Sequence, residues 1–195
     1  MANYTSPTCP SDCGSLTLPS YSYTACDDNY TVESSEIQFL YLAAQSEDVD
    51  GNPVPIAKPT DWTSASDWAA VISDTGDNVR KIEVIGDKPA TEDQEVSLPG
   101  FRSKIQARTH TLNITINDMN GTNYDFFNTL STCGGSVYAW IQTNGDYLYG
   151  GGDGIRCNVQ SCSYVLERGE GSTSRWDLVL EWQGLAQPPR IESPI

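Results

Sequence analysis

The sequence predicts a mainly β protein with one or two short helices and extended segments at both ends. Residues 104–117 (KIQARTHTLNITIN) alternate apolar and polar side chains along their whole length, which is typical of a long half-buried strand. Asn144-Gly145 stands between two runs rich in aromatic and β-branched residues, and this dipeptide is a strong β-hairpin signal. Apolar residues at helical spacing occur only in two short stretches. Together these patterns favour a sheet protein.

Length and charge limit what the chain can be. Its 195 residues fit one ordinary domain with appendages, and 38% hydrophobic residues suffice for a core. The net charge of −15 argues against a nucleic-acid-binding protein, because binding to phosphates needs clustered Lys and Arg. Most of the excess lies in residues 1–100, where 17 acidic and 4 basic residues leave −13. We therefore expect a negative surface in the first half of the fold.

Three segments follow one another along the chain. Residues 1–34 are rich in Ser, Thr, Tyr, Pro and Cys without a sustained period, which predicts an extended N-terminal arm. A β-rich domain follows over residues 35–184 and opens with an apolar strand at 36–44. Residues 185–195 contain a Pro-Pro pair and are expected to form a C-terminal arm without regular structure.

The first predicted helix covers about residues 61–73. Thr60 or Asp61 is expected to be its N-cap, because short polar side chains there accept hydrogen bonds from the first free backbone N–H groups. Trp62 and Trp68 fall in the repeat of apolar residues at three and four positions. We therefore expect both tryptophans to dock this helix onto the sheet.

A second helix is predicted at about 123–131, with Tyr124 and Phe127 on its packed side. The segment 91–98 is acidic and is expected to be an edge strand. The other predicted strands are separated by turn-forming residues and lie at 81–85, 104–117, 136–143, 146–149, 158–166 and 174–182.

The spacing of the six cysteines does not indicate a clear disulfide framework. A disulfide set requires an oxidising compartment, and the first residues lack the basic start and apolar core of a secretory signal. Cys9, Cys13 and Cys26 could supply three thiolates to zinc, but no fourth ligand is evident. Free thiols and a local disulfide remain the alternatives. We expect no metal and no cofactor.

The search for catalytic residues leads to a single histidine, His110. It lies in a strand-like alternation beside Thr109 and Thr111, where a histidine is typically a structural hydrogen-bonding residue. No nucleophile elbow of the Gly-x-Ser-x-Gly kind is present, and no carboxylate pair stands out among the 26 acids. The sequence therefore predicts a protein that is not an enzyme.

Four runs in the second half carry a resemblance to a known family: 108–116 (RTHTLNITI), 123–128 (NYDFFN), 137–146 (VYAWIQTNGD) and 177–182 (DLVLEW). In this order they resemble structural proteins of tailed bacteriophages, in particular the tail-tube (major tail) proteins of phages that infect Bacteroidetes. The resemblance covers about residues 80–184, roughly half of the chain, through its succession of strand, helix and hairpin.

This resemblance implies a β-sandwich or half-barrel subunit of the phage tail-tube type, placed in the virion tail and assembled in the host cytoplasm. Copies would form stacked hexameric rings joined by extended arms, with other virion proteins as further partners. The lumen would carry DNA only as transported cargo, and a net charge of −15 suits it because it repels phosphate. No membrane contact is expected, since no apolar run is long enough to span one.

Strands 104–117 and 136–149 are the candidates for an intersubunit barrel, because long strands can continue into a sheet shared with neighbours. We expect polar side chains toward its lumen. Lys104 and Arg108 share one face, which opposes a uniformly negative wall unless both point outward or pair with acids. The candidate assembly residues on these strands are Lys104, Gln106, Arg108, His110, Tyr138, Trp140, Gln142, Tyr147 and Tyr149.

Two alternatives remain open at this point. One is another phage structural role, such as a head decoration, head–tail connector or tail terminator protein. The other is a carbohydrate-binding β-sandwich, because the aromatic residues around Tyr138 and Tyr147 could form a sugar-stacking platform or equally a buried barrel face. The carbohydrate-binding hypothesis predicts that Trp140 or Trp182 is exposed.

Overall fold

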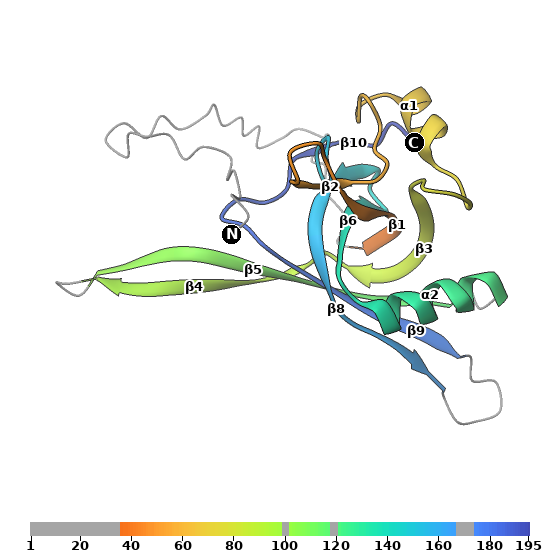
Figure 1. Ribbon diagram of the computed structural model, residues 1–195. Coiled ribbons are helices and arrows are strands. Elements are labelled where there is room, and N and C mark those ends of the chain that lie inside the picture. The colour runs from red at the N-terminus through yellow and green to blue at the C-terminus, as the bar shows by residue number, and fades with distance from the viewer. Residues whose placement is uncertain (1–35, 99–101, 118–120, 167–173) are drawn as a thin grey trace, which may run out of the picture.

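The computed structural model describes residues 36–98, 102–117, 121–166 and 174–195 (Figure 1). Within these ranges it contains ten strands and two helices, so the predicted mainly β class is confirmed. No described helix has the length and apolar character needed to cross a membrane. Residues 1–34, which hold the predicted N-terminal arm with Cys9, Cys13 and Cys26, lie outside the described residues.

Six strands close into a barrel, because the middle strand β6 pairs with β1 on one side and with β8 on the other. The ring then continues from β8 through β9, β5 and β3 back to β1, with every pairing antiparallel. In chain order these strands are β1 (Glu36–Glu47), β3 (Arg80–Asp87), β5 (Arg102–Ile116), β6 (Ser136–Thr143), β8 (Ile155–Val165) and β9 (Arg175–Gln183).

The shortest seam of the barrel joins β3 to β5 through Ile85 opposite Thr115 and Gly86 opposite Ile114. Gly86 has no room for a side chain, since a Cβ there would lie 2.7 Å from the carbonyl oxygen of Asn113. The close approach of the two backbones therefore depends on glycine at this position.

Four shorter or outlying strands extend the barrel sheet. They are β2 (Pro53–Pro55) on β1, β4 (Ala90–Leu98) on β5, β7 (Tyr147–Tyr149) on β6, and β10 (Arg190–Glu192) on β7. The turn between β6 and β7 lies at Asn144-Gly145, as predicted, although Asp146 rather than Gly145 adopts the left-handed conformation.

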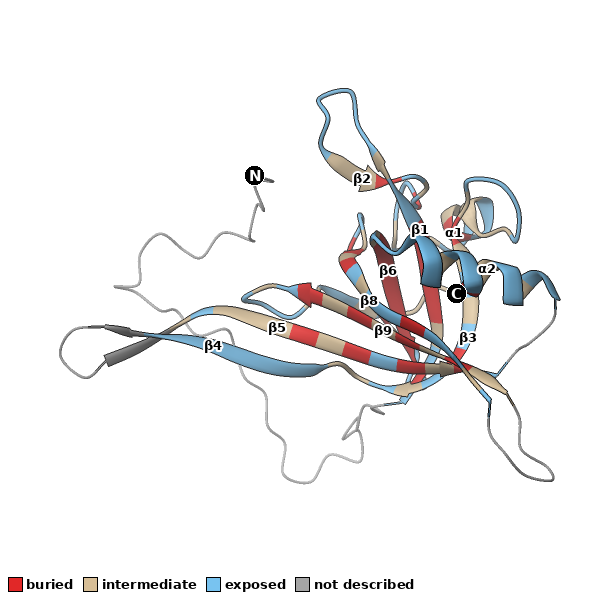
Figure 2. Cartoon of the chain, turned by 60° about the horizontal axis from the view of Figure 1, so that its bottom comes forward, coloured by how far each residue is buried: buried red, intermediate tan, exposed pale blue. Residues whose placement is uncertain are grey.

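Period-two burial builds the core inside the barrel. On β9 the side chains alternate between buried and half-buried, and Leu178 and Leu180 are fully buried. On β5 the buried positions Leu112, Ile114 and Ile116 follow the same alternation (Figure 2). The interior is therefore filled by apolar side chains from opposite walls, as expected for a small barrel.

A second cluster covers the outer face of β6. Tyr138 and Trp140 on that face are buried together with Tyr41 of β1 and Trp68. The Tyr41 hydroxyl donates to the Gln142 side-chain oxygen at 2.6 Å, and burial raises the pKa of Tyr41 above its ordinary value. Strand β6 is thus buried on both faces, which its sequence alternation alone did not predict.

Both predicted helices are present with shifted ends. The first, α1 (Ala65–Val71), begins later than expected because Ser64 caps it: its side chain accepts from the Asp67 N–H at 3.4 Å. Asp61 instead stabilises the preceding turn by accepting from the Thr63 hydroxyl at 2.7 Å and from the Thr63 N–H at 2.9 Å, and these hydrogen bonds lower its pKa. The second, α2 (Gly121–Cys133), is longer than predicted at both ends.

The C-terminal segment differs from the expected irregular arm. Strand β10 pairs with β7, and the Gly150 N–H donates to the Pro189 carbonyl at 3.0 Å. Ile191 and Ile195 pack against the second cluster. Apolar contact and edge pairing therefore hold this segment on the barrel despite its prolines, which precede the strand rather than interrupt it.

Candidate assembly surface

A hairpin made of β4 and the first half of β5 projects away from the barrel (Figures 1 and 2). All residues from Ala90 to Val96 are exposed. Strand β4 thus buries no side chain between Ala90 and Val96, whereas His110 of β5 is buried where that strand enters the barrel. The predicted acidic edge strand at 91–98 and the predicted long strand at 104–117 are both confirmed.

Both long edges of this hairpin are open within the described part of the chain. Strand β4 pairs only with β5. Pairing of β5 with β9 ends at Thr109 opposite Gln183, followed by one last contact from the Gly184 N–H to the Arg108 carbonyl at 3.0 Å. From Ala107 outward no described strand pairs with that side of β5. Open edges of this kind present unpaired backbone donors and acceptors.

The strand β5 carries a bulge near the middle of the hairpin. Gln94 lies opposite Ala107, whereas Glu95 lies opposite Ile105, so Gln106 is an extra residue without its own partner. A bulge increases the local twist and bends the strand. The outer part of the hairpin is therefore turned relative to its root.

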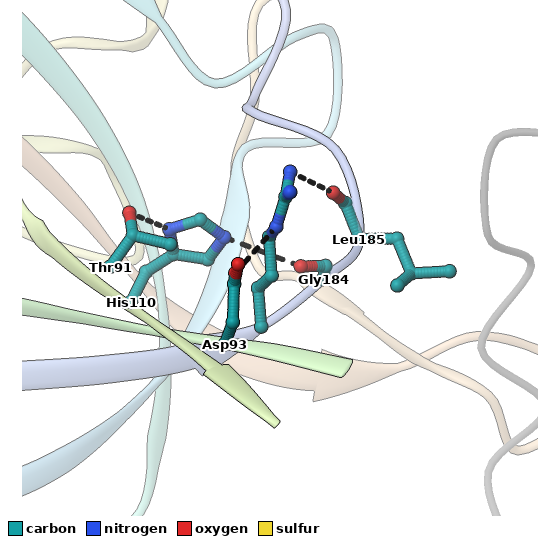
Figure 3. Close-up of polar contacts among 6 residues, drawn as sticks. Thr91, Asp93, His110, Gly184 and Leu185 are labelled. Carbon is teal, nitrogen blue, oxygen red and sulfur yellow. Dashed lines mark hydrogen bonds and ion pairs between the residues drawn. The ribbon is translucent and has the colours of Figure 1, made fainter. Parts of the chain in front are cut away.

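At the root, the buried His110 joins the hairpin to the segment that follows β9 (Figure 3). Its Nδ1 lies 2.9 Å from the Thr91 hydroxyl, and its Nε2 lies 3.3 Å from the Gly184 carbonyl. A carbonyl only accepts, so Nε2 carries the hydrogen and Nδ1 accepts from Thr91. The ring also stacks on Trp182, with centroids 5.3 Å apart.

Arg108 makes a second link at the same root (Figure 3). Its Nε donates to the Asp93 carboxylate at 2.8 Å across the hairpin, and a terminal nitrogen donates to the Leu185 carbonyl at 3.2 Å. The pair is about one-third exposed, so its own energy is small. Together with the His110 contacts it fixes the direction in which the hairpin leaves the barrel.

The other candidate assembly residues fall in two places. Gln106 is exposed on the hairpin, and Lys104 lies at the register position opposite Val96, with its side chain outside the described set. Tyr138, Trp140 and Gln142 are buried inside the single chain and therefore cannot line a lumen. The expectation of lumen-facing residues is therefore wrong for the β6 part of 136–149, because the outer face of β6 is covered by the second cluster.

Tyr147 and Tyr149 lie on β7 beside β10 and are half-buried. The Arg190 guanidinium lies 4.5 Å from the centre of the Tyr147 ring, a cation–π contact that ties the C-terminal strand to β7. These tyrosines are therefore used within the chain, where they support the packing of the C-terminal strand.

The aromatic docking residues predicted on the two helices act inside this chain. Trp68 is fully buried and its indole N–H donates to the Trp62 carbonyl at 2.9 Å. Phe127 enters the barrel core, while the partly exposed Tyr124 packs edge-on against Tyr164 at 5.5 Å. These contacts agree with the docking role expected from the helical spacing.

No exposed tryptophan platform for sugars exists where the carbohydrate hypothesis requires one. Trp140 is 0% exposed and Trp182 is 5% exposed. A sugar ring needs access to the face of an aromatic ring, and both faces are covered by protein. The prediction of the carbohydrate-binding hypothesis that Trp140 or Trp182 is exposed is therefore wrong.

The described cysteines and acids do not gather into a metal site. No group of three or more His, Cys, Asp or Glu side chains that could hold an ion occurs among the described residues. Cys133 is an exposed thiol, whereas Cys157 and Cys162 are buried thiols; burial raises the pKa of both, to about 11 for Cys162. The zinc hypothesis for Cys9, Cys13 and Cys26 falls outside the described residues.

An open groove of about 1680 Å³ lies between α2 and β3. Its walls mix apolar side chains such as Ile82, Phe126 and Leu130 with Arg80 and Asp125. The Arg80 guanidinium donates to loop carbonyls, including that of Ser73 at 2.7 Å, so it serves to hold the adjacent loop.

The two strands of the hairpin were predictable from the sequence. Their projection from the barrel was not, nor were the hydrogen bonds that join His110 to Thr91 and Gly184. One local signal was available: Pro99-Gly100, a turn-forming dipeptide, separates the acidic run from the basic start of the next strand. That the two strands leave the barrel follows only from where β3 and β9 stop pairing with β5.

Comparison with known protein families and with curated protein sequences finds no match for this chain.

Proposed function

We propose that this chain is a structural subunit that assembles with copies of itself into rings, as a tail-tube protein of a tailed bacteriophage. The projecting β4–β5 hairpin with its two open edges is the observation that carries the proposal. The order of strands, helix and hairpin that resembles tail-tube proteins supports the phage assignment. In this proposal the barrel is the rigid body and the hairpin is the joining element.

A two-stranded hairpin in water is at best marginally stable by itself. The exposed β4 side chains bury nothing against the barrel, so the outer hairpin depends on its ladder and on the root contacts of His110 and Arg108. Pairing with a neighbouring chain would satisfy its backbone groups and order it. The hairpin is thus built for a partner strand.

Ring formation follows from the kind of contact that the hairpin offers. One copy can present β4 to the β5 edge of the next copy, which is a head-to-tail contact using two different surfaces. Such contacts produce closed rings where the rotation between copies closes. The resemblance implies six copies, and a net charge of −15 for each subunit would keep DNA from adhering to the bore.

The direct test compares the full chain with a variant that lacks the outer hairpin, by negative-stain electron microscopy and light scattering. Gln94 and Ala107 lie opposite each other, so residues 95–106 can be replaced by Asn-Gly to leave a two-residue hairpin turn. This variant keeps Thr91, Asp93, Arg108 and His110. The free energy of unfolding of its barrel should therefore equal that of the full chain.

We expect hollow rings or tubes from the full chain and monomers from the shortened one. Rings that persist in the shortened variant would show that another surface joins the subunits. A full chain that stays monomeric at high concentration contradicts ring assembly. Trimers that bind capsids contradict the tail-tube assignment and favour a head decoration protein.

A further inference from the structure

Charge is segregated between the two strands of the hairpin. Strand β4 carries Glu92, Asp93 and Glu95 and no basic residue. The hairpin part of β5 carries Arg102, Lys104 and Arg108 and no acidic residue. One edge of the hairpin therefore belongs to an acidic strand and the other to a basic strand.

The register of the hairpin places one acid directly opposite one base. Asp93 lies opposite Arg108 and forms the ion pair at the root. Glu92 lies opposite Thr109, and Glu95 lies opposite Ile105. Lys104 and Arg102 likewise occupy the positions opposite Val96 and Leu98. The segregation is therefore not a set of directly opposed pairs within one chain.

The same two strands are the ones with open edges. Strand β4 has no second partner in the described chain, and β5 has none beyond the Gly184 contact at Arg108. Opposite charges on adjacent strands stabilise an antiparallel pair, and like charges opposite each other destabilise it. An acidic edge strand fits a basic edge strand and rejects a copy of itself.

We propose that β4 of one copy adds to the β5 edge of the next copy, and that this charge difference selects the head-to-tail contact. The inference rests on the proposed ring assembly and names the surfaces that join. Copies related by rotation about one axis place β4 beside the neighbouring β5 in antiparallel order, the same order as within each hairpin. The hairpins then form one continuous antiparallel sheet.

The charge pattern also opposes the competing two-fold contacts. Pairing β4 with β4 would bring two acidic strands together, and pairing β5 with β5 would bring two basic strands together. Each is a two-fold contact that occupies an edge needed for the head-to-tail contact. Like-charge repulsion disfavours both two-fold contacts, so the head-to-tail contact between β4 and β5 is preferred.

Charge reversal tests this directly, with the root pair Asp93–Arg108 left intact. The first variant is Glu92→Lys with Glu95→Lys, which makes both strands basic. The second is Arg102→Glu with Lys104→Glu, which makes both acidic. The third combines all four changes. A control, Asp50→Lys with Asp77→Lys, has the net charge change of the first variant at exposed positions outside the hairpin.

Assembly is followed by light scattering against concentration, and folding by the urea midpoint of each variant. For the first and second variants alone, we expect the protein concentration at which half of the chains are assembled to rise by at least about tenfold. An equimolar mixture of the two should recover wild-type assembly, because each acidic strand again meets a basic one. The combined variant should recover it alone, and the control should match wild type.

The outcomes separate the two proposals. Folded single-strand variants that assemble like wild type overturn the charge selection while the ring proposal stands. A mixture or combined variant that fails to recover assembly overturns the β4-to-β5 contact. A wild-type chain that forms no rings contradicts the proposed function itself.

Discussion

The barrel and the hairpin share one strand, and β5 shows how differently the two regions are held. In the barrel half of β5, Leu112, Ile114 and Ile116 are buried between opposite walls. In the hairpin half, every residue from Ile105 to Thr109 retains solvent exposure, and the partner strand β4 is exposed from Ala90 to Val96. Backbone pairing continues through both halves, although from Ala107 outward β5 is paired on one side only among the described strands.

Apolar burial is what distinguishes the two regions. The net contribution of a backbone hydrogen bond in water is small, whereas burying an aliphatic side chain stabilises by roughly 1.5–3 kcal/mol. The barrel should therefore carry the folding stability of the chain. The hairpin should change little in stability when altered, but much in assembly.

The largest effect is expected from a cavity in the barrel. Leu180 of β9 is fully buried, and Leu180→Ala should lower the free energy of unfolding by about 2–5 kcal/mol. Urea denaturation at concentrations where the chain is monomeric measures the loss. A cost near zero would show that the barrel interior is not the source of stability.

The next effect comes from the glycine that faces the second cluster. Gly154 has a φ of +78°, and a Cβ there would lie 2.9 Å from the Trp140 ring, so Gly154→Ala should cost about 1–3 kcal/mol. Thermal unfolding and tryptophan fluorescence report it. Gly152→Ala is the matched control, since nothing lies within 4 Å of its Cβ and its φ is not left-handed. Equal losses in both variants would contradict the packing argument.

Alkaline pH should weaken the barrel through a buried thiol. Burial raises the pKa of Cys162 from 9.0 to about 11, so between these values the folded chain retains a proton that the unfolded chain has lost. This stabilisation is complete below about pH 9 and is lost as pH rises toward 11. Urea midpoints measured across this range should fall, and less steeply in Cys162→Ala. The exposed Cys133→Ala should leave the slope unchanged.

A smaller effect is expected at the root of the hairpin. Thr91→Val removes the hydroxyl that donates to Nδ1 of buried His110, which should cost about 1 kcal/mol and speed hydrogen exchange of the neighbouring amides. Thr109→Val is the control, because its hydroxyl accepts from the exposed Gln94 side chain rather than from a buried group. Faster exchange in Thr109→Val but not in Thr91→Val would show that the Thr91–His110 hydrogen bond does not hold the root of the hairpin.

The smallest effect is expected on the hairpin itself. Val96 is 42% exposed and Val84 in β3 is 4% exposed, so the same change to Ala samples both regions. Val96→Ala should alter the free energy of unfolding by no more than about 0.5 kcal/mol, and Val84→Ala should lower it by about 1–2 kcal/mol. Similar values from urea denaturation would remove the distinction between barrel and hairpin.

Local patterns were sufficient to locate most elements. The alternation over 104–117 predicted a long strand, and β5 extends over Arg102–Ile116. The apolar spacing around Trp68 and Phe127 predicted two docked helices, and both side chains are buried. The start of α1 was misplaced because Asp61 and Ser64 are both suitable caps, and the turn at 61–64 decides between them.

Residues whose role depends on distant neighbours were not predictable in the same way. In sequence, Tyr138 and Trp140 fit a sugar-stacking platform and a buried barrel face equally well, and α1 and the C-terminal segment cover them. Arg190–Glu192 follows two prolines and still forms a strand, because β7 offers an edge and the second cluster accepts Ile191. Coverage of this kind comes from segments far apart in the chain.

The sequence by itself determined the mainly β class, the length of β5, the hairpin at Asn144-Gly145 and the acidic character of β4. Each depends on neighbouring residues, through the period-two alternation of a strand or the turn preference of a dipeptide. Only the tertiary structure decided which edges are closed and which remain open. Strand pairing joins residues remote in sequence, and the alternation that marks a strand does not specify the partner of its edge.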